Sequence, residues 1–139
     1  MRLKGKVALV TGAATGVERE LMGFGGATAW LFAREGAGVV IADIDERLGL
    51  KTAEQIHEAG HEALFVRLDV TSEEDWASAI EATVTRFSQL NILVNNAGTA
   101  ARATVENTTL EMWEGQMDVH AKGTFLGTKA AIPEMRKAG

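Results

Sequence analysis

The sequence has 139 residues, enough for one domain, and 46% of them are hydrophobic, enough to fill a core. Its 14 basic and 19 acidic residues give a net charge of -5, which disfavours nucleic acid and anionic membranes as partners. It has no cysteine for disulfides or thiolate metal sites and no apolar run that could span a bilayer, so we expect a cytoplasmic protein.

Strand-like and helix-like stretches alternate along the first half of the chain. The pattern predicts strands at 6–10, 39–42 and 63–68, with helices at 27–34 and 46–59. No linker or repeat interrupts it. This alternation is typical of an α/β domain in which helices cover both faces of a parallel sheet.

The second half continues the alternation. A hydroxyl cap and three acidic residues at 71–75 predict the start of a helix that runs through Phe87, and residues 91–94 form a fourth strand. A capping box formed by Thr108 and Glu111 predicts a long helical region, bent or broken at Pro133.

A glycine turn, Thr11 to Gly16, directly follows the first predicted strand. Such a turn lets backbone amides and the positive end of a helix dipole approach a pyrophosphate. Three further signals follow the other strands: Asp43, the pair Asp69-Val70, and the run 95–98, Asn-Asn-Ala-Gly. The carboxyl ends of parallel strands share one edge of a sheet, so the four signals together predict a dinucleotide site.

These motifs, with residues 25–42 and 117–135, resemble the first half of a short-chain dehydrogenase/reductase. The resemblance implies oxidoreductase ancestry and a truncated Rossmann-like three-layer sandwich, with a parallel sheet in the order 3-2-1-4. It also implies that residues 1–139 form a single truncated dinucleotide-binding domain.

Carried over position by position, the resemblance implies four groups of contacts to NAD. The pyrophosphate would contact Gly12, Thr15, Gly16 and Val17. The adenosine ribose would contact Asp43 and Ile44, and the adenine would contact Asp69 and Val70. The nicotinamide-side ribose would contact Asn96, Ala97 and Gly98. A purely structural role is the alternative, because Gly and Asn are also common turn residues.

The glycine turn departs from the family pattern. Glu18 stands where a third glycine is expected, and Gly25-Gly26 resumes the pattern, so residues 18–24 form a seven-residue insertion. The insertion either obstructs the turn and brings Glu18 and Glu20 near the phosphates, or bulges into solvent and leaves Gly12 and Gly16 in place. In the first case, deletion of 18–24 would strengthen NAD binding.

The catalytic residues of the family are missing. Its asparagine is replaced by His120, which we expect to be a partly buried polar residue on the long helix, and the sequence contains no tyrosine. The chain stops at Gly139, before the family's serine, tyrosine and lysine. We therefore expect no catalytic residue, no metal site and no independent hydride transfer.

Three functions remain open. The chain is an NAD-binding domain that favours NAD over NADP because Asp43 repels a 2′-phosphate, or an oxidoreductase subunit completed by a partner, or a non-enzymatic oligomer with a remodelled nucleotide turn. A homo-oligomer is expected in any case, because strand 91–94 would expose an unpaired edge.

Overall fold

The computed structural model describes residues 1–18 and 20–139. Four strands form one parallel sheet in the order β3-β2-β1-β4. The strands are β1 (Val7–Thr11), β2 (Gly38–Asp43), β3 (Ala63–Arg67) and β4 (Ile92–Val94). The three-layer α/β fold and the sheet order predicted from the sequence are confirmed.

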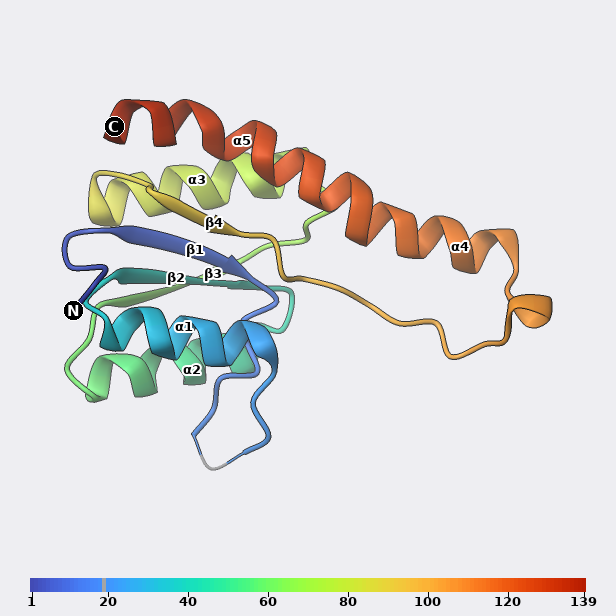
Figure 1. The fold of residues 1–139 in the computed structure, drawn as a ribbon, viewed down its shortest axis with the longest axis horizontal. Coiled ribbons are helices and arrows are strands. Elements are labelled where there is room, and N and C mark those ends of the chain that lie inside the picture. The colour runs from blue at the N-terminus through green and yellow to red at the C-terminus, as the bar shows by residue number, and fades with distance from the viewer. Residues whose placement is uncertain (19) are drawn as a thin grey trace.

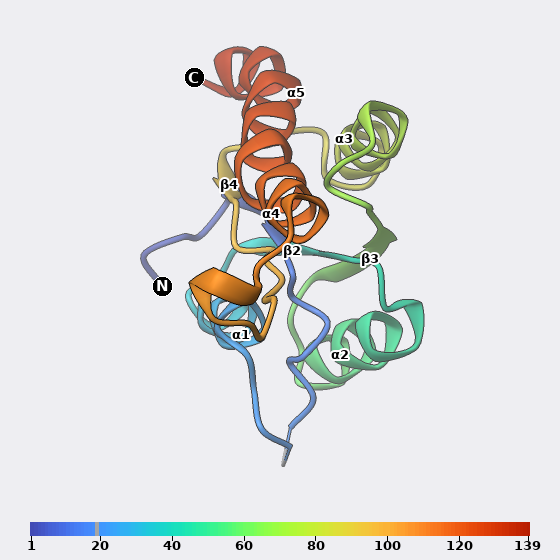
Figure 2. The same cartoon turned by 90° about the vertical axis from the view of Figure 1, so that its right-hand side faces the viewer.

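Helices cover both faces of the sheet (Figures 1 and 2). Helices α1 (Phe24–Arg34) and α2 (Glu46–Glu58) pack on one face, around Val10, Val39 and Ile41. Helices α3 (Glu73–Phe87) and α5 (Gly123–Ala138) pack on the other, around Leu9, Val40 and Trp76. Because alternate residues of a strand point to opposite faces, β1 and β2 contribute to both cores, which explains their continuous apolar sequences.

The chain from β4 to α5 leaves the body of the molecule. It passes through a 3-10 turn (Val105–Asn107) into α4 (Leu110–Met117), which projects beyond the sheet (Figure 1). A π-helical turn, Asp118–Lys122, joins α4 to α5. A π-turn inserts an extra residue into the helix and changes which side chains face inward.

Several predicted boundaries shift. Helix α1 begins at Phe24 rather than residue 27. Helix α4 is capped by Thr109, whose hydroxyl accepts from the Met112 amide, while the Thr108 hydroxyl donates to the Thr104 carbonyl. Helix α5 continues through Pro133 without a break, and the irregularity falls at the π-turn instead.

Candidate functional site

The predicted site residues meet at the carboxyl ends of the four strands, where the structure has a pocket of about 460 Å³. The predicted residues that line it are Gly12, Thr15, Asp43, Ile44, Asp69, Val70, Asn96, Ala97 and Gly98. It is also lined by Gly23, Phe24, Leu68, Thr99 and Val119. Nine of the eleven residues chosen from sequence motifs therefore surround one pocket, at the edge where open α/β sheets bind their ligands.

Gly12 forms the sharp end of β1. Its φ of +64° lies in the left-handed region, which favours glycine, and its amide donates to the Ala42 carbonyl at 2.8 Å. A Cβ atom at this position would lie 2.8 Å from the Ala97 Cα. Backbone from β1 and backbone from the loop after β4 thus touch here, and a side chain would separate them.

The second half of the glycine turn begins at Gly23, inside the insertion predicted at 18–24. The Gly23 amide donates to the Thr15 carbonyl at 3.0 Å, and Gly23 is the N-cap of α1. A Cβ atom on Gly25 would overlap the Gly12 carbonyl oxygen and the Asn96 side-chain nitrogen. The turn therefore runs from Gly12 to Thr15 and resumes at Gly23.

Gly16 and Val17 do not reach the pocket. Both are buried, and a Cβ atom on Gly16 would lie 2.6 Å from the Thr52 methyl carbon of α2. The extra segment is thus Gly16–Met22, displaced by two residues from the sequence-based assignment of 18–24. The two alignments are hard to separate by sequence, because Gly16-Val17 and Gly23-Phe24 offer the same glycine-apolar pair seven residues apart.

The described residues of the extra segment, 16–18 and 20–22, extend away from the sheet on the side of α1 and α2 (Figures 1 and 2). Glu18 pairs with Arg34 of α1 at 3.6 Å, and Glu20 pairs with Lys51 of α2 at 3.0 Å. The described residues of this segment do not line the pocket. Of the two placements that the sequence left open, these contacts favour the one away from the pocket, with Gly12 in place but Gly16 outside the lining. Tighter NAD binding after deletion of 18–24 was the consequence of the other placement.

Asp43 is held by the turn that it faces. One carboxylate oxygen accepts from the Ala14 amide at 3.0 Å, and the other accepts from the Asp45 amide at 3.1 Å. The carboxylate is thereby fixed at the end of β2, with lone pairs remaining for further donors. Ile44 beside it is largely exposed and lines the same wall.

Asp69 and Val70 shape the wall after β3. The Thr71 hydroxyl and the Thr71 amide both donate to Asp69, and these bonds hold the pKa of its carboxyl below the usual value. The Val70 carbonyl accepts from the indole nitrogen of Trp76 at 2.9 Å. The backbone of this wall is thus fastened to the first turn of α3.

The loop after β4 is fixed by Thr11. The buried Thr11 hydroxyl accepts from the Asn96 and Ala97 amides at 3.0 and 2.9 Å and donates to the Val94 carbonyl. The Asn96 side chain donates in turn to the Thr11 and Gly12 carbonyls. This network connects the two strands on which the glycine turn and the loop depend.

His120 lies in the π-turn and is exposed rather than partly buried as expected. Its Nε2 atom lies 2.9 Å from the Thr99 carbonyl oxygen and 3.3 Å from the Thr99 amide nitrogen. The π-turn in which it lies was not predicted from the sequence. Thr99 lines the pocket, so His120 supports one of its walls.

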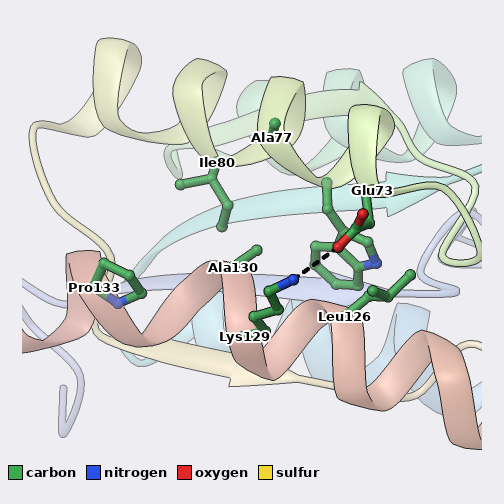
Figure 3. Close-up of a pocket in the computed structure, with 8 residues that line it drawn as sticks. Glu73, Ala77, Ile80, Leu126, Lys129, Ala130 and Pro133 are labelled. Carbon is green, nitrogen blue, oxygen red and sulfur yellow. Dashed lines mark hydrogen bonds and ion pairs between the residues drawn. The ribbon is translucent and has the colours of Figure 1, made fainter.

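A second cavity, of about 280 Å³, lies between α3 and α5 (Figure 3). Its walls are mainly apolar and include Trp76, Ile80 and Leu126. At one side Lys129 and Glu73 point toward each other and pair at 2.9 Å, which lowers the pKa of the Glu73 carboxyl. None of the predicted site residues lines this cavity, so it is not the predicted nucleotide site.

Within 1–18 and 20–139, no helix is long and apolar enough to cross a membrane. The same ranges contain no group of three or more His, Asp or Glu residues that could hold a metal ion.

Comparison with known proteins gives the family. A family model described as enoyl-(acyl carrier protein) reductase matches residues 16–139. The chain is 44% identical to a 2,5-dichloro-2,5-cyclohexadiene-1,4-diol dehydrogenase of Sphingobium indicum over 99% of this chain and 52% of that protein. It is 43% identical to a trans-4-hydroxycyclohexanecarboxylate dehydrogenase of Sinomonas cyclohexanicum, over 99% of this chain and 53% of the relative.

A third relative is a 3-alpha-(or 20-beta)-hydroxysteroid dehydrogenase of Mycobacterium bovis, 39% identical over 99% of this chain and 49% of the relative. The chain thus spans about half the length of the curated relatives that it matches. The family match, the parallel sheet and the residues around its carboxyl edge agree with the resemblance seen in the sequence. The chain belongs to the short-chain dehydrogenase/reductase family, and its extent is consistent with the family's N-terminal half.

Proposed function

We propose that the chain binds NAD in the pocket at the carboxyl ends of the strands. The observation that carries this proposal is the meeting of the glycine turn, Asp43, Asp69 and the Asn96–Gly98 loop around one pocket. Its volume of about 460 Å³ lies within the range of small-molecule sites, which run from about 300 to 1,000 Å³. The family membership supports the same ligand.

The geometry changes one part of the assignment. Gly23 and Phe24 stand where the sequence placed Gly16 and Val17, so the proposed pyrophosphate contacts are Gly12, Thr15, Gly23 and Phe24. The first amides of α1 and its dipole favour a phosphate at this place. The other proposed contacts are unchanged: Asp43 and Ile44 for the ribose, Asp69 and Val70 for the adenine, and Asn96, Ala97 and Gly98 for the nicotinamide side.

We also propose that the chain does not transfer hydride by itself. The family's tyrosine has no counterpart, because the sequence contains none, and general acid catalysis requires a donor within reach of the reacting oxygen. An oxidoreductase subunit completed by a partner would gain NADH production when that partner is added. A non-enzymatic oligomer would not bind NAD at all.

Calorimetric titration with NAD and NADP tests the proposed binding. NAD should bind with one site per chain, and NADP should bind at least about tenfold more weakly, because the Asp43 carboxylate repels a 2′-phosphate. Asp43→Asn should weaken NAD binding and reduce the difference between the affinities for NAD and NADP, since it removes the negative charge of the carboxylate. Glu46→Gln is the control, because Glu46 is an exposed residue outside the pocket lining. Equal affinities of the wild-type chain for both cofactors would contradict the assignment of Asp43.

We propose that the chain forms a homo-oligomer. Within the described sheet β4 pairs with β1 alone, so its second edge has free backbone groups. Large apolar side chains are exposed on α4 and α5, among them Trp113, Met117 and Phe125. Two contacts are available to a second copy: pairing of the β4 edges into one larger sheet, or packing of the long helices.

Light scattering at micromolar concentration distinguishes an oligomer from a monomer, and two variants distinguish the two contacts. We expect a dimer or larger oligomer in the wild-type chain. Phe125→Glu should dissociate a contact made by the helices, whereas Leu93→Pro should dissociate a contact made by the strand edges, because proline has no amide to donate. Circular dichroism checks that each variant stays folded. A monodisperse wild-type monomer would refute the proposed assembly.

A further inference from the structure

The buried side chain of Thr52 in α2 forms hydrogen bonds with the backbone of the glycine turn, on the side away from the pocket. Thr52 has an exposed fraction of 0%, lies outside the pocket lining, and makes two contacts with the turn. Its hydroxyl donates to the Ala14 carbonyl at 2.6 Å and accepts from the Gly16 amide at 3.3 Å. The same two backbone groups also bond to each other at 2.9 Å, so Thr52 adds a link from α2 to a turn that is closed around Thr15.

These contacts extend in two directions. On one side, the Ala14 amide donates to the Asp43 carboxylate at 3.0 Å. On the other, the Gly16 carbonyl accepts from the indole nitrogen of Trp30 in α1 at 2.6 Å. Thr52 therefore stands between the carboxylate proposed to hold the ribose and the segment that leaves the pocket along α1 and α2.

The extra segment passes close to Thr52 where it begins. The Thr52 methyl carbon would lie 2.6 Å from a Cβ atom at Gly16, so the chain passes Thr52 closely at a residue without a side chain. Beyond Gly16, the Glu18 amide donates to the Gln55 side chain of α2 at 2.9 Å. The segment is thereby fastened to α2 one helical turn after Thr52.

We infer that Thr52 is a positioning residue of the NAD site: it orients Ala14, and through it Asp43, and it keeps Gly16 and the segment after it away from the pocket. The inference rests on the proposed NAD binding. Without the hydroxyl, the Ala14 carbonyl and the Gly16 amide keep only the hydrogen bond of 2.9 Å that they make to each other, and the turn loses its link to α2. The turn would then move relative to α2, which would shift the Ala14 amide and the Asp43 carboxylate bound to it, and Gly16 would be free to move toward the pocket.

Two substitutions separate the hydroxyl from the packing. Thr52→Val keeps the shape but removes the hydroxyl, and Thr52→Ser keeps the hydroxyl but removes the methyl group. The matched control is Thr83→Val, because Thr83 in α3 is also 0% exposed and its hydroxyl donates to the Ala79 carbonyl at 2.7 Å, away from the pocket. If a loss of stability alone weakened NAD binding, both valine variants would bind NAD more weakly.

The experiment measures the Kd for NAD by calorimetry and amide hydrogen exchange by NMR in the full chain. Thr52→Val should raise the Kd by about tenfold, as expected for the loss of two buried hydrogen bonds, while Thr52→Ser stays within about threefold of wild type. Exchange of the Ala14 and Gly16 amides should accelerate in Thr52→Val and recover in Thr52→Ser. Thr83→Val should change neither quantity.

Unchanged exchange at Ala14 and Gly16 in Thr52→Val would overturn the inference, and so would an unchanged Kd. If the wild-type chain does not bind NAD, the proposed function fails, but the exchange rates still decide whether Thr52 positions the turn. A Kd that rises equally in Thr52→Val and Thr83→Val would assign the effect to general destabilisation and would also overturn it.

Discussion

Gly25→Ala should lower the free energy of unfolding by about 3 kcal/mol, the upper end of the usual cost of overpacking a core. The added methyl group would overlap the Gly12 carbonyl oxygen and the Asn96 side-chain nitrogen. Both are held by hydrogen bonds between β1 and the loop after β4, so neither can move without breaking that network. Urea denaturation followed by circular dichroism measures the change.

The control for this substitution is Gly115→Ala in α4. A Cβ atom there meets nothing within 4 Å, and alanine is favoured over glycine in a helix interior by about 1 kcal/mol. This variant should be as stable as the wild-type chain or more so. Similar stabilities for the two alanine variants would show that α1 does not approach β1 and Asn96 as closely as described.

Phe24→Glu should weaken NAD binding by about tenfold to a hundredfold, because it places a carboxylate beside the position proposed for the pyrophosphate. Phe24 lines the pocket with a side chain that is 90% exposed. It is also the first residue of α1, where a negative charge stabilises the helix, so unfolding would not explain the loss. Calorimetric titration measures the affinity.

Leu21→Glu is the matched control for Phe24→Glu. Leu21 is 97% exposed, lies three residues earlier, and does not line the pocket. It should bind NAD with wild-type affinity. In the sequence-based alignment both residues belong to the insertion, so equal effects of the two substitutions would favour that alignment over the observed turn.

The sequence predicted most of the fold because its strands and helices carry strong local signals. The apolar runs of β1 and β2 are buried on both faces, and Ser72 caps α3 as the acidic first turn suggested. The prediction that the helix is bent or broken at Pro133 was wrong as to a break, since α5 continues from Gly123 to Ala138. Its own residues Leu126 and Ala131 are buried in the core and hold the helix against the sheet. Local patterns do not record such tertiary contacts.

Nine of the eleven predicted site residues line the pocket because their positions follow from strand ends, which the sequence marks clearly. Gly16 and Val17 do not line the pocket, for a different reason. Two equivalent glycine-apolar pairs compete for one place at the start of α1, and the choice depends on contacts with Thr52 and Gly12 that only the folded chain provides. Thr99 and Val119 were missed because the loop after β4 and the π-turn have no recognisable motif.

An NMR titration of the wild-type chain with NAD, followed at each backbone amide, tests most directly whether NAD binds at the turn that resumes at Gly23. We predict saturable shifts at Gly12, Gly23 and Phe24 and at Asp43, with much smaller shifts at Gly16 and Val17. Saturable shifts centred on Gly16 and Val17 would place the pyrophosphate in the sequence-based turn and contradict the proposed contacts. The absence of any saturable shift would show that the chain does not bind NAD.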